Sequence, residues 1–296
     1  MIRVSVAPPD NQSHAPRRIA AALVEHAPSF VEFAPWKQAD LVVLHVLGRL
    51  KQTTELVDML RARGKQYAVI QYCLRSTQQP DTSRWRDIWD GAKAVWSYVD
   101  LAKWVEEDGG DPHFPNLYVS PFGVDPEVFT HSAGPRQFLV ATTGFSSLTE
   151  SVREVGIAAG RADGSIFHLG PRLKLIQRHD VTFGENISDS ELAERLGECQ
   201  YVSGLRRIEG FELPAAEGLV CGARPILFDQ PHYYQWYQGL AEFIPEGTRT
   251  EVVRSLEKLF QKPYQPVTPA ERAEAVRRFD WNRVVSEFWE RIHDAA

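Results

Sequence analysis

The 296-residue sequence has few cysteines, no long apolar run and no strong excess of charge. Its three cysteines, Cys73, Cys199 and Cys221, are odd in number and widely spaced in apolar surroundings, which favours buried free thiols over disulfides or a zinc site. No apolar segment reaches the roughly 20 residues of a transmembrane helix. Residues 2–6 have a strand pattern in place of a signal peptide. We therefore expect a cytoplasmic protein without a transmembrane segment.

The formal net charge is −6, from 33 basic and 39 acidic residues. An acidic chain has no overall attraction for nucleic acid or anionic membranes, so nucleic acid is kept only as a minor alternative among the partners. The sequence contains no Asp-x-Asp motif, and we expect neither a metal ion nor another cofactor. With 43% hydrophobic and 24% charged residues, the composition is that of a globular protein, and the length predicts two domains.

Apolar segments alternate with helical patterns along the chain and predict parallel sheets of the α/β class. In the first half, strands are expected at 2–6, 41–46, 67–72 and 94–98, and helices at 17–26 and 53–63. In the second half, strands are expected at 138–141, 165–169, 181–183, 201–203 and 224–228, and helices at 149–160, 190–198 and 213–220. A linker at 262–269 precedes one amphipathic helix that extends to 292. Both halves therefore resemble Rossmann-like domains.

The segment 203–229, SGLRRIEGFELPAAEGLVCGARPILFD, is the most informative part of the chain. A strand ends before a glycine-containing loop, and the helix that follows ends at Gly222. The free backbone N–H groups and positive dipole of such a helix start can hold a diphosphate. Glu209 can accept hydrogen bonds from sugar hydroxyls, and the two oxygens of Glu217 can take both hydroxyls of a ribose. Taken alone, a loop glutamate is usually solvated and an early-helix glutamate usually interacts only with the helix dipole. The complete sequence string favours a binding site instead.

This string resembles the donor site of retaining GT-B glycosyltransferases, in which two glutamates are separated by seven residues. The segment 121–129, PFGVDPEVF, and the tail residues Phe279 and Trp281 are also similar to that family, although we expect the two aromatic residues to pack in a core. The resemblance implies a GT-B fold, with two Rossmann-like domains facing across a cleft and a C-terminal helix crossing back. The expected domains are 1–130 for the acceptor, 131–270 for the nucleotide sugar, and 271–296 for the helix that packs back on the first domain.

The resemblance and the local patterns together give three sets of candidate site residues. The expected catalytic residues are Glu209, His45 and Arg207. The expected donor-binding residues are Glu217, Gly210, Phe211, Glu212, Leu213, Arg206, Gly144 and Arg172. The expected acceptor-binding residues are Trp85, Trp89 and His14, because the two tryptophans lie in a polar segment and aromatic rings stack on sugars and bases. No residue is expected to bind a metal.

The family usually has an Arg and a Lys after the first strand of the second domain, where they neutralise the donor diphosphate. Here the region 141–150 reads ATTGFSSLTE and contains no cation. Arg206, Arg207 and Arg172 are the candidates to replace that pair, because a guanidinium makes paired bonds to phosphate oxygens. The resemblance thus implies a metal-independent, retaining hexosyltransferase that moves a sugar from a nucleoside diphosphate to a hydroxyl acceptor. The expected acceptor is a glycan or a small molecule, and a hydroxylated DNA base is a minor alternative. The alternative is a non-catalytic nucleotide-sugar-binding or partner module.

Overall fold

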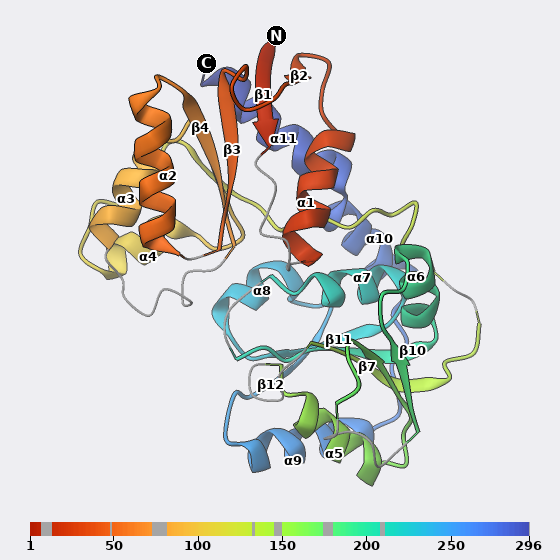
Figure 1. Ribbon diagram of the computed structural model, residues 1–296. Helices are drawn as coiled ribbons and strands as arrows, with labels where there is room; N and C mark the ends of the chain where they lie inside the picture. The colour runs from red at the N-terminus through yellow and green to blue at the C-terminus, as the bar shows by residue number, and fades with distance from the viewer. Residues whose placement is uncertain are drawn as a thin grey trace. The chain divides into compact units, whose positions relative to one another are not determined.

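The structure is a computed structural model that describes residues 1–6, 14–47, 49–72, 82–131, 134–144, 150–173, 180–207 and 211–295 (Figure 1). The chain forms two compact units. The first unit comprises the described residues of 1–123, Phe211 and 281–295, and the second comprises 124–207 and 212–280. The chain thus passes from the first unit to the second after Gly123. The sequence predicts this boundary slightly later, near residue 130.

The first unit contains a six-stranded, fully parallel sheet with the order β2-β1-β3-β4-β5-β6. Its strands are β1 (Ile2–Val6), β2 (Val31–Phe33), β3 (Leu41–Val46), β4 (Gln66–Gln71), β5 (Val95–Ser97) and β6 (Leu117–Val119). The strand order reverses between β1 and β3, which is the switch point of this sheet. In open α/β sheets, ligands bind outside the carboxyl ends of the strands at such a point.

Helices cover both faces of the first sheet, as Figure 1 shows. They are α1 (His14–Glu25), α2 (Leu50–Ala62), α3 (Thr82–Asp90), α4 (Leu101–Glu107) and α11 (Trp281–Asp294). Apolar residues of α2, α3 and α4 share one core with β3, β4 and β5. On the other face, the Trp289 indole of α11 donates a hydrogen bond to the Leu23 carbonyl of α1. The last helix is therefore an integral part of the first unit.

The second unit contains another six-stranded parallel sheet, with the order β12-β11-β10-β7-β8-β9. Its strands are β7 (Phe138–Thr143), β8 (Ile166–Leu169), β9 (Val181–Gly184), β10 (Cys199–Gly204), β11 (Arg224–Phe228) and β12 (Glu242–Ile244). The order reverses between β7 and β10. This pair of strands marks the switch point of the second sheet.

The second sheet is also covered on both faces. Its helices are α5 (Val152–Arg161), α6 (Asp189–Gly197), α7 (Leu213–Cys221), α8 (Pro231–Tyr237), α9 (Arg249–Phe260) and α10 (Pro269–Phe279). Helices α5 and α9 share an apolar core with the sheet, and α6, α7 and α10 lie together on the opposite face (Figure 1). Capping boxes at Thr248 and Thr268 begin α9 and α10, because each threonine and the glutamate three residues later bond the other's backbone N–H.

The two parallel six-stranded sheets confirm the predicted α/β class with two Rossmann-like halves. The prediction of one continuous C-terminal helix is wrong. Asp280 has an extended conformation with ψ 118°, and it separates α10 from α11. Phe279 and Trp281 on either side of this break are buried, as expected. Cys199 and Cys221 are buried free thiols, also as expected, and Cys73 lies outside the described residues.

Candidate functional site

The switch point of the second sheet brings two chain segments together. Strand β7 ends at Thr143 and is followed by Gly144, and the adjacent strand β10 ends at Gly204. Arg206 lies two residues after the end of β10, and helix α7 begins at Leu213. The carboxyl ends of β7 and β10 and the start of α7 therefore frame the position at which an open α/β sheet binds its ligand.

Arg206 is held at this point by two carboxylates. Its Nε lies 2.7 Å from Glu212 Oε1, and its Nη1 lies 3.8 Å from Glu150 Oε1. Glu212 immediately precedes α7, whereas Glu150 follows β7, so the guanidinium joins the two sides of the switch point. The negative charge of Glu212 raises the pKa of Arg206, which stays charged. Burial raises the pKa of Glu212, and the charge of Arg206 opposes this effect.

Helix α7 places two predicted donor-binding residues against the sheet. Leu213 and Glu217 are 4% and 2% exposed, respectively. Glycine is required at position 218 within this helix, because a Cβ there would lie 2.5 Å from Val202 Cγ1 of β10. The Glu212 carbonyl accepts a 3.1 Å hydrogen bond from the Tyr237 hydroxyl, which fixes the start of α7 from the side of α8. The amino end of α7 is thereby positioned by close packing.

Arg207 lies on the other side of β10 from Arg206. Its Nη1 donates a 3.1 Å hydrogen bond to the Gly247 carbonyl after β12, and its guanidinium lies over the Phe228 ring of β11. Glu246 lies 4.0 Å away and also accepts a hydrogen bond from the Gln230 amide. Within the described part of the chain, the buried Nη2 of Arg207 and Oε1 of Gln230 have no hydrogen-bond partner. Arg207 is thus directed toward β11 and β12, and Arg206 toward β7.

Two glycine turns follow β7 and β8. Gly144 and Gly170 have φ values of 117° and 141°, which favour glycine. The His168 ring is buried next to these turns, and its Nδ1 lies 2.8 Å from the Thr142 hydroxyl. Burial lowers the pKa of His168 to about 4, so this histidine is neutral at pH 7. Arg172 beyond the second turn is exposed, and its guanidinium lies over the Phe183 ring.

His45 lies at the carboxyl end of β3, beside the switch point of the first sheet. Its Nδ1 is 2.6 Å from the Tyr72 hydroxyl, and the two rings are nearly parallel. Burial lowers the pKa of His45 to about 4 and raises the pKa of Tyr72. Tyr72 contacts Phe122, which in turn packs edge-on against Phe211. The described aromatic residues at this edge of the first sheet thus form one cluster that includes the predicted residues His45 and Phe211.

The structure corrects the predicted position of two acceptor residues. Trp85 and Trp89 are both fully buried in the core of the first unit, with stacked rings 5.9 Å apart. They form the inner face of α3, so neither offers a surface for an acceptor. Glu209 and Gly210 lie outside the described residues, as does the His14 side chain.

The side chains that hold the candidate residues in place have no local signal in the sequence. Glu150 and Tyr72 are distant in sequence from Arg206 and His45, and no local pattern connects them. His168 could have been noticed, because it is a histidine within an apolar strand, as His45 is. None of the three was expected to take part in a site.

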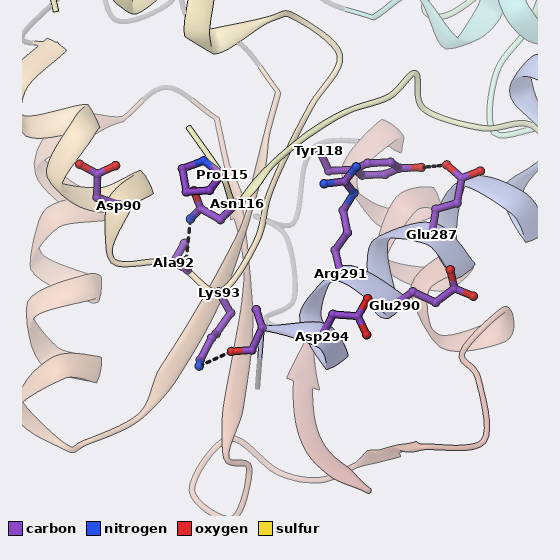
Figure 2. Close-up of a pocket in the computed structure, with 11 residues that line it drawn as sticks. Asp90, Ala92, Lys93, Pro115, Asn116, Tyr118, Glu287, Glu290, Arg291 and Asp294 are labelled. Atoms are coloured by element: carbon purple, nitrogen blue, oxygen red, sulfur yellow. Dashed lines mark hydrogen bonds between the residues drawn. The ribbon is translucent and has the colours of Figure 1, made fainter. Parts of the chain in front are cut away.

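A separate pocket of about 830 Å³ lies in the first unit, at the amino ends of β5 and β6 (Figure 2). The Tyr118 hydroxyl donates a 2.7 Å hydrogen bond to the Glu287 carboxylate (Figure 2), and Lys93 donates a 2.7 Å hydrogen bond to the Ala295 carbonyl. The Arg291 guanidinium lies over the Tyr118 ring. The pocket lies at the opposite end of the strands from His45.

Among the described residues, no helix is long and apolar enough to cross a membrane. The same residues include no group of three His, Cys, Asp or Glu side chains that could hold a metal ion.

The comparisons with known proteins assign the fold. No model of a known protein family matches the sequence, and no curated protein sequence matches it. Solved structures match over nearly the whole chain, and they show that the chain has the GT-B fold of two Rossmann-like domains.

Three of these structures illustrate the similarity. Sucrose-phosphate synthase from Thermosynechococcus elongatus has a TM-score of 0.73 at 11% identity, with 99% of each chain covered. HepE from Anabaena, in complex with UDP and glucose, has a TM-score of 0.75 at 12% identity, also with 99% of each chain covered. The pneumococcal O-GlcNAc transferase GtfA, in complex with UDP and GlcNAc, has a TM-score of 0.63 at 14% identity, with 94% of this chain and 60% of that chain covered.

Proposed function

We propose that the protein is a retaining glycosyltransferase that moves a hexosyl group from a nucleoside diphosphate sugar to a hydroxyl acceptor without a metal ion. The observation that carries this proposal is the position of Arg206 at the switch point of the second sheet, beside the start of α7. A cation and a helix amino end at one point suit the diphosphate of a nucleotide sugar. Several solved structures with the same fold contain UDP or UDP-glucose, which supports a donor of this class.

In this proposal, the second unit binds the donor. Arg206 and the first N–H groups of α7 neutralise the diphosphate, and Glu217 binds the ribose. When the sugar–phosphate bond breaks, negative charge grows on the leaving diphosphate and positive charge on the sugar. Arg206 then stabilises the transition state more than the ground state, which is the condition for accelerating the reaction.

The first unit binds the acceptor in this proposal, and the acceptor is a glycan or a small molecule. The burial of Trp85 and Trp89 removes the exposed tryptophan pair that would have stacked on a sugar or on a base, so it does not distinguish these acceptors. The net charge of −6 opposes a nucleic-acid acceptor. A hydroxylated base in DNA therefore stays a minor alternative.

A second candidate function is a non-catalytic nucleotide-sugar-binding module. Among the described residues around the switch point, the guanidiniums of Arg206 and Arg207 face three carboxylates, those of Glu150, Glu212 and Glu246. The net charge of this set is negative, whereas a site that stabilises a leaving diphosphate is expected to be positive. Less positive charge is then available to the leaving diphosphate, whereas recognition of the ribose by Glu217 does not depend on that charge, and this favours binding without turnover.

Release of nucleoside diphosphate distinguishes the two functions. The full chain is incubated with a panel of nucleotide sugars, with and without glycan, small-molecule and hydroxylated DNA acceptors, and nucleoside diphosphate is quantified. If the protein is a glycosyltransferase, nucleoside diphosphate is released, an acceptor accelerates the release, and the release continues in the presence of EDTA. Retention of the anomeric configuration is then read from the product by NMR. Binding of a nucleotide sugar without release of nucleoside diphosphate, across the whole panel, would favour the binding module.

A further inference from the structure

The amino end of α7 has few free backbone donors. In the turn from Leu213 to Ala216, Pro214 has no N–H group. The N–H groups of Ala215 and Ala216 both donate to the Glu212 carbonyl, with N–O distances of 3.0 and 3.2 Å. Among the residues that the structure describes, none accepts a hydrogen bond from the Leu213 N–H. In this turn, Leu213 therefore supplies the backbone N–H that a bound ligand can use.

Tyr237 holds the peptide group to which this N–H belongs. A trans peptide is planar, so the Glu212 C=O and the Leu213 N–H point in opposite directions and can only turn together. The Tyr237 hydroxyl donates a 3.1 Å hydrogen bond to that carbonyl oxygen. Burial raises the pKa of Tyr237, so the phenol keeps its proton and stays a donor. The hydroxyl of Tyr237 thus fixes the direction of the Leu213 N–H.

Two helices fix the position of Tyr237. Tyr237 is the last residue of α8 and is fully buried. Its ring centroid lies 5.3 Å from that of Phe279, the last residue of α10. The Arg278 guanidinium of α10 also donates a 2.6 Å hydrogen bond to the Trp236 carbonyl of α8. Because α8 and α10 are joined in this way, the phenol is held in place from outside α7.

We propose that Tyr237 is a positioning residue of the donor site and directs the Leu213 N–H at the diphosphate of a nucleotide sugar. Glu212 joins the two parts of this site. Its carbonyl is held by Tyr237, and its carboxylate lies 2.7 Å from Arg206 Nε. These four residues all belong to the second unit. The identity of the ligand rests on the proposed function.

The hydroxyl of Tyr237 has a second effect on the same N–H. A hydrogen bond to the C=O of a peptide group polarises the whole group and strengthens its N–H as a donor. In Tyr237→Phe the ring remains and both effects are lost. We expect the affinity for a nucleoside diphosphate to fall about three- to tenfold, and the affinity for the nucleoside without phosphate to stay within about twofold of wild type.

Tyr264→Phe is the matched control, because it acts on the opposite end of the same helix. The Tyr264 hydroxyl donates a 3.3 Å hydrogen bond to the carbonyl of Gly222, which caps the carboxyl end of α7. Each variant loses one tyrosine hydroxyl that bonds a backbone carbonyl at an end of α7. A general loosening of the helix would lower the diphosphate affinity of both variants, whereas the positioning role predicts a loss only in Tyr237→Phe.

Nuclear magnetic resonance reports on this peptide group directly. With ¹³C in the glutamate carbonyls and ¹⁵N in leucine, a carbonyl–nitrogen correlation spectrum of the full chain shows only the three Glu-Leu peptides, at 55–56, 191–192 and 212–213. Leu213→Met identifies the signal of the third peptide. In wild type, its amide proton should move downfield when the nucleoside diphosphate binds, because the N–H then donates to a phosphate oxygen. In Tyr237→Phe, its carbonyl carbon should move upfield, because the oxygen has lost a hydrogen bond.

Calorimetric titration with UDP, GDP and ADP, each beside its nucleoside, gives the affinities. Two results would overturn the positioning role and leave the donor site standing, provided that wild type binds one of these diphosphates. The first is a Leu213 amide proton that does not move in wild type, a test that holds even if Tyr237→Phe does not fold. The second is a wild-type ratio of diphosphate to nucleoside affinity in folded Tyr237→Phe. If wild type binds none of the three diphosphates, the proposed function fails, and this inference fails with it.

Discussion

Arg206 Nε lies 2.7 Å from the buried carboxylate of Glu212, and this ion pair occupies the switch point of the second sheet. If Arg206 binds the donor diphosphate, Glu212 competes with that ligand for the same guanidinium. In the free protein, Glu212 therefore lowers the positive charge of Arg206 that is available to a diphosphate. Glu150, at 3.8 Å, competes more weakly for the same guanidinium.

Replacing Glu212 by Gln should strengthen diphosphate binding. The change removes one negative charge near the phosphates and keeps an oxygen that can accept from Arg206. After discounting for solvent screening, we expect a gain of about 1 kcal/mol, or roughly fivefold in affinity. Calorimetric titration with the nucleoside diphosphate checks the value. Glu150→Gln should give a smaller gain, and the affinity for the nucleoside alone should not change. Weaker diphosphate binding by both variants would show that these carboxylates support the site.

Glu217 is predicted to recognise the ribose of the donor. In Glu217→Ala, the loss of a buried bidentate contact should cost about 1–3 kcal/mol, or about 5- to 150-fold in nucleotide affinity. Comparison of the ribonucleotide with its 2′-deoxy analogue separates this role from a general loss of structure. Wild type should prefer the ribonucleotide, and the variant should bind both equally. A preference retained in full by a folded variant would remove Glu217 from the ribose site.

The buried histidines predict a loss of stability in mild acid. The pKa of His168 is about 4 in the folded protein and about 6.5 in an unfolded chain, so below pH 6.5 the unfolded state binds a proton that the native state does not. Stability attributable to His168 is therefore present above pH 6.5 and is lost as the pH falls toward 4, by up to roughly 3 kcal/mol. Urea unfolding of wild type and His168→Gln between pH 7 and 4.5 tests this slope. An equally steep slope in both proteins would contradict it.

Trp85 is expected to act on stability and not on acceptor binding. Because the indole is fully buried, Trp85→Ala should lower the free energy of unfolding by about 3–5 kcal/mol. Trp36, which is 38% exposed, offers a control whose change to Ala should cost about 1 kcal/mol or less. Urea unfolding gives both values. The milder variant Trp85→Phe, once shown to be folded, should retain the acceptor KM of wild type. A raised acceptor KM in that variant would restore Trp85 to the site.

The sequence predicted the alternation of the longer strands and helices along the chain, because hydrophobic periodicity is a local signal. The short strands β2, β6 and β12 and the helices α3, α4, α8 and α9 were not predicted. The prediction that Trp85 and Trp89 are exposed was wrong, and the local sequence pattern explains why. These residues and Ile88 are spaced three and four apart and form the buried stripe of α3, while the neighbouring charged residues cover its other face. The many charges led to the prediction of a polar segment with exposed tryptophans, although the helical spacing of its apolar residues was present.

The site was only partly predictable, because its contacts join residues that are distant in sequence. Glu212 and Arg206 belong to one local segment that the sequence had already selected. Glu150 comes from the other side of the switch point, and Tyr72 directly follows β4, the strand that pairs with β3. The break at Asp280 was missed for a similar reason. There the Phe279 carbonyl accepts a hydrogen bond from the distant Val124 N–H, and the extended backbone of Asp280 ends α10.

If Arg206 neutralises the diphosphate of a nucleotide-sugar donor, its removal should slow donor cleavage in a single turnover. We expect Arg206→Ala to slow cleavage about 100- to 1,000-fold, far more than it weakens binding of the nucleoside monophosphate, and Arg206→Lys to restore only part of the rate. Arg161→Ala is the matched control, because Arg161 lies at the carboxyl end of α5 and pairs with Glu257 on the surface. Cleavage by Arg206→Ala at the wild-type rate would show that Arg206 does not neutralise the diphosphate.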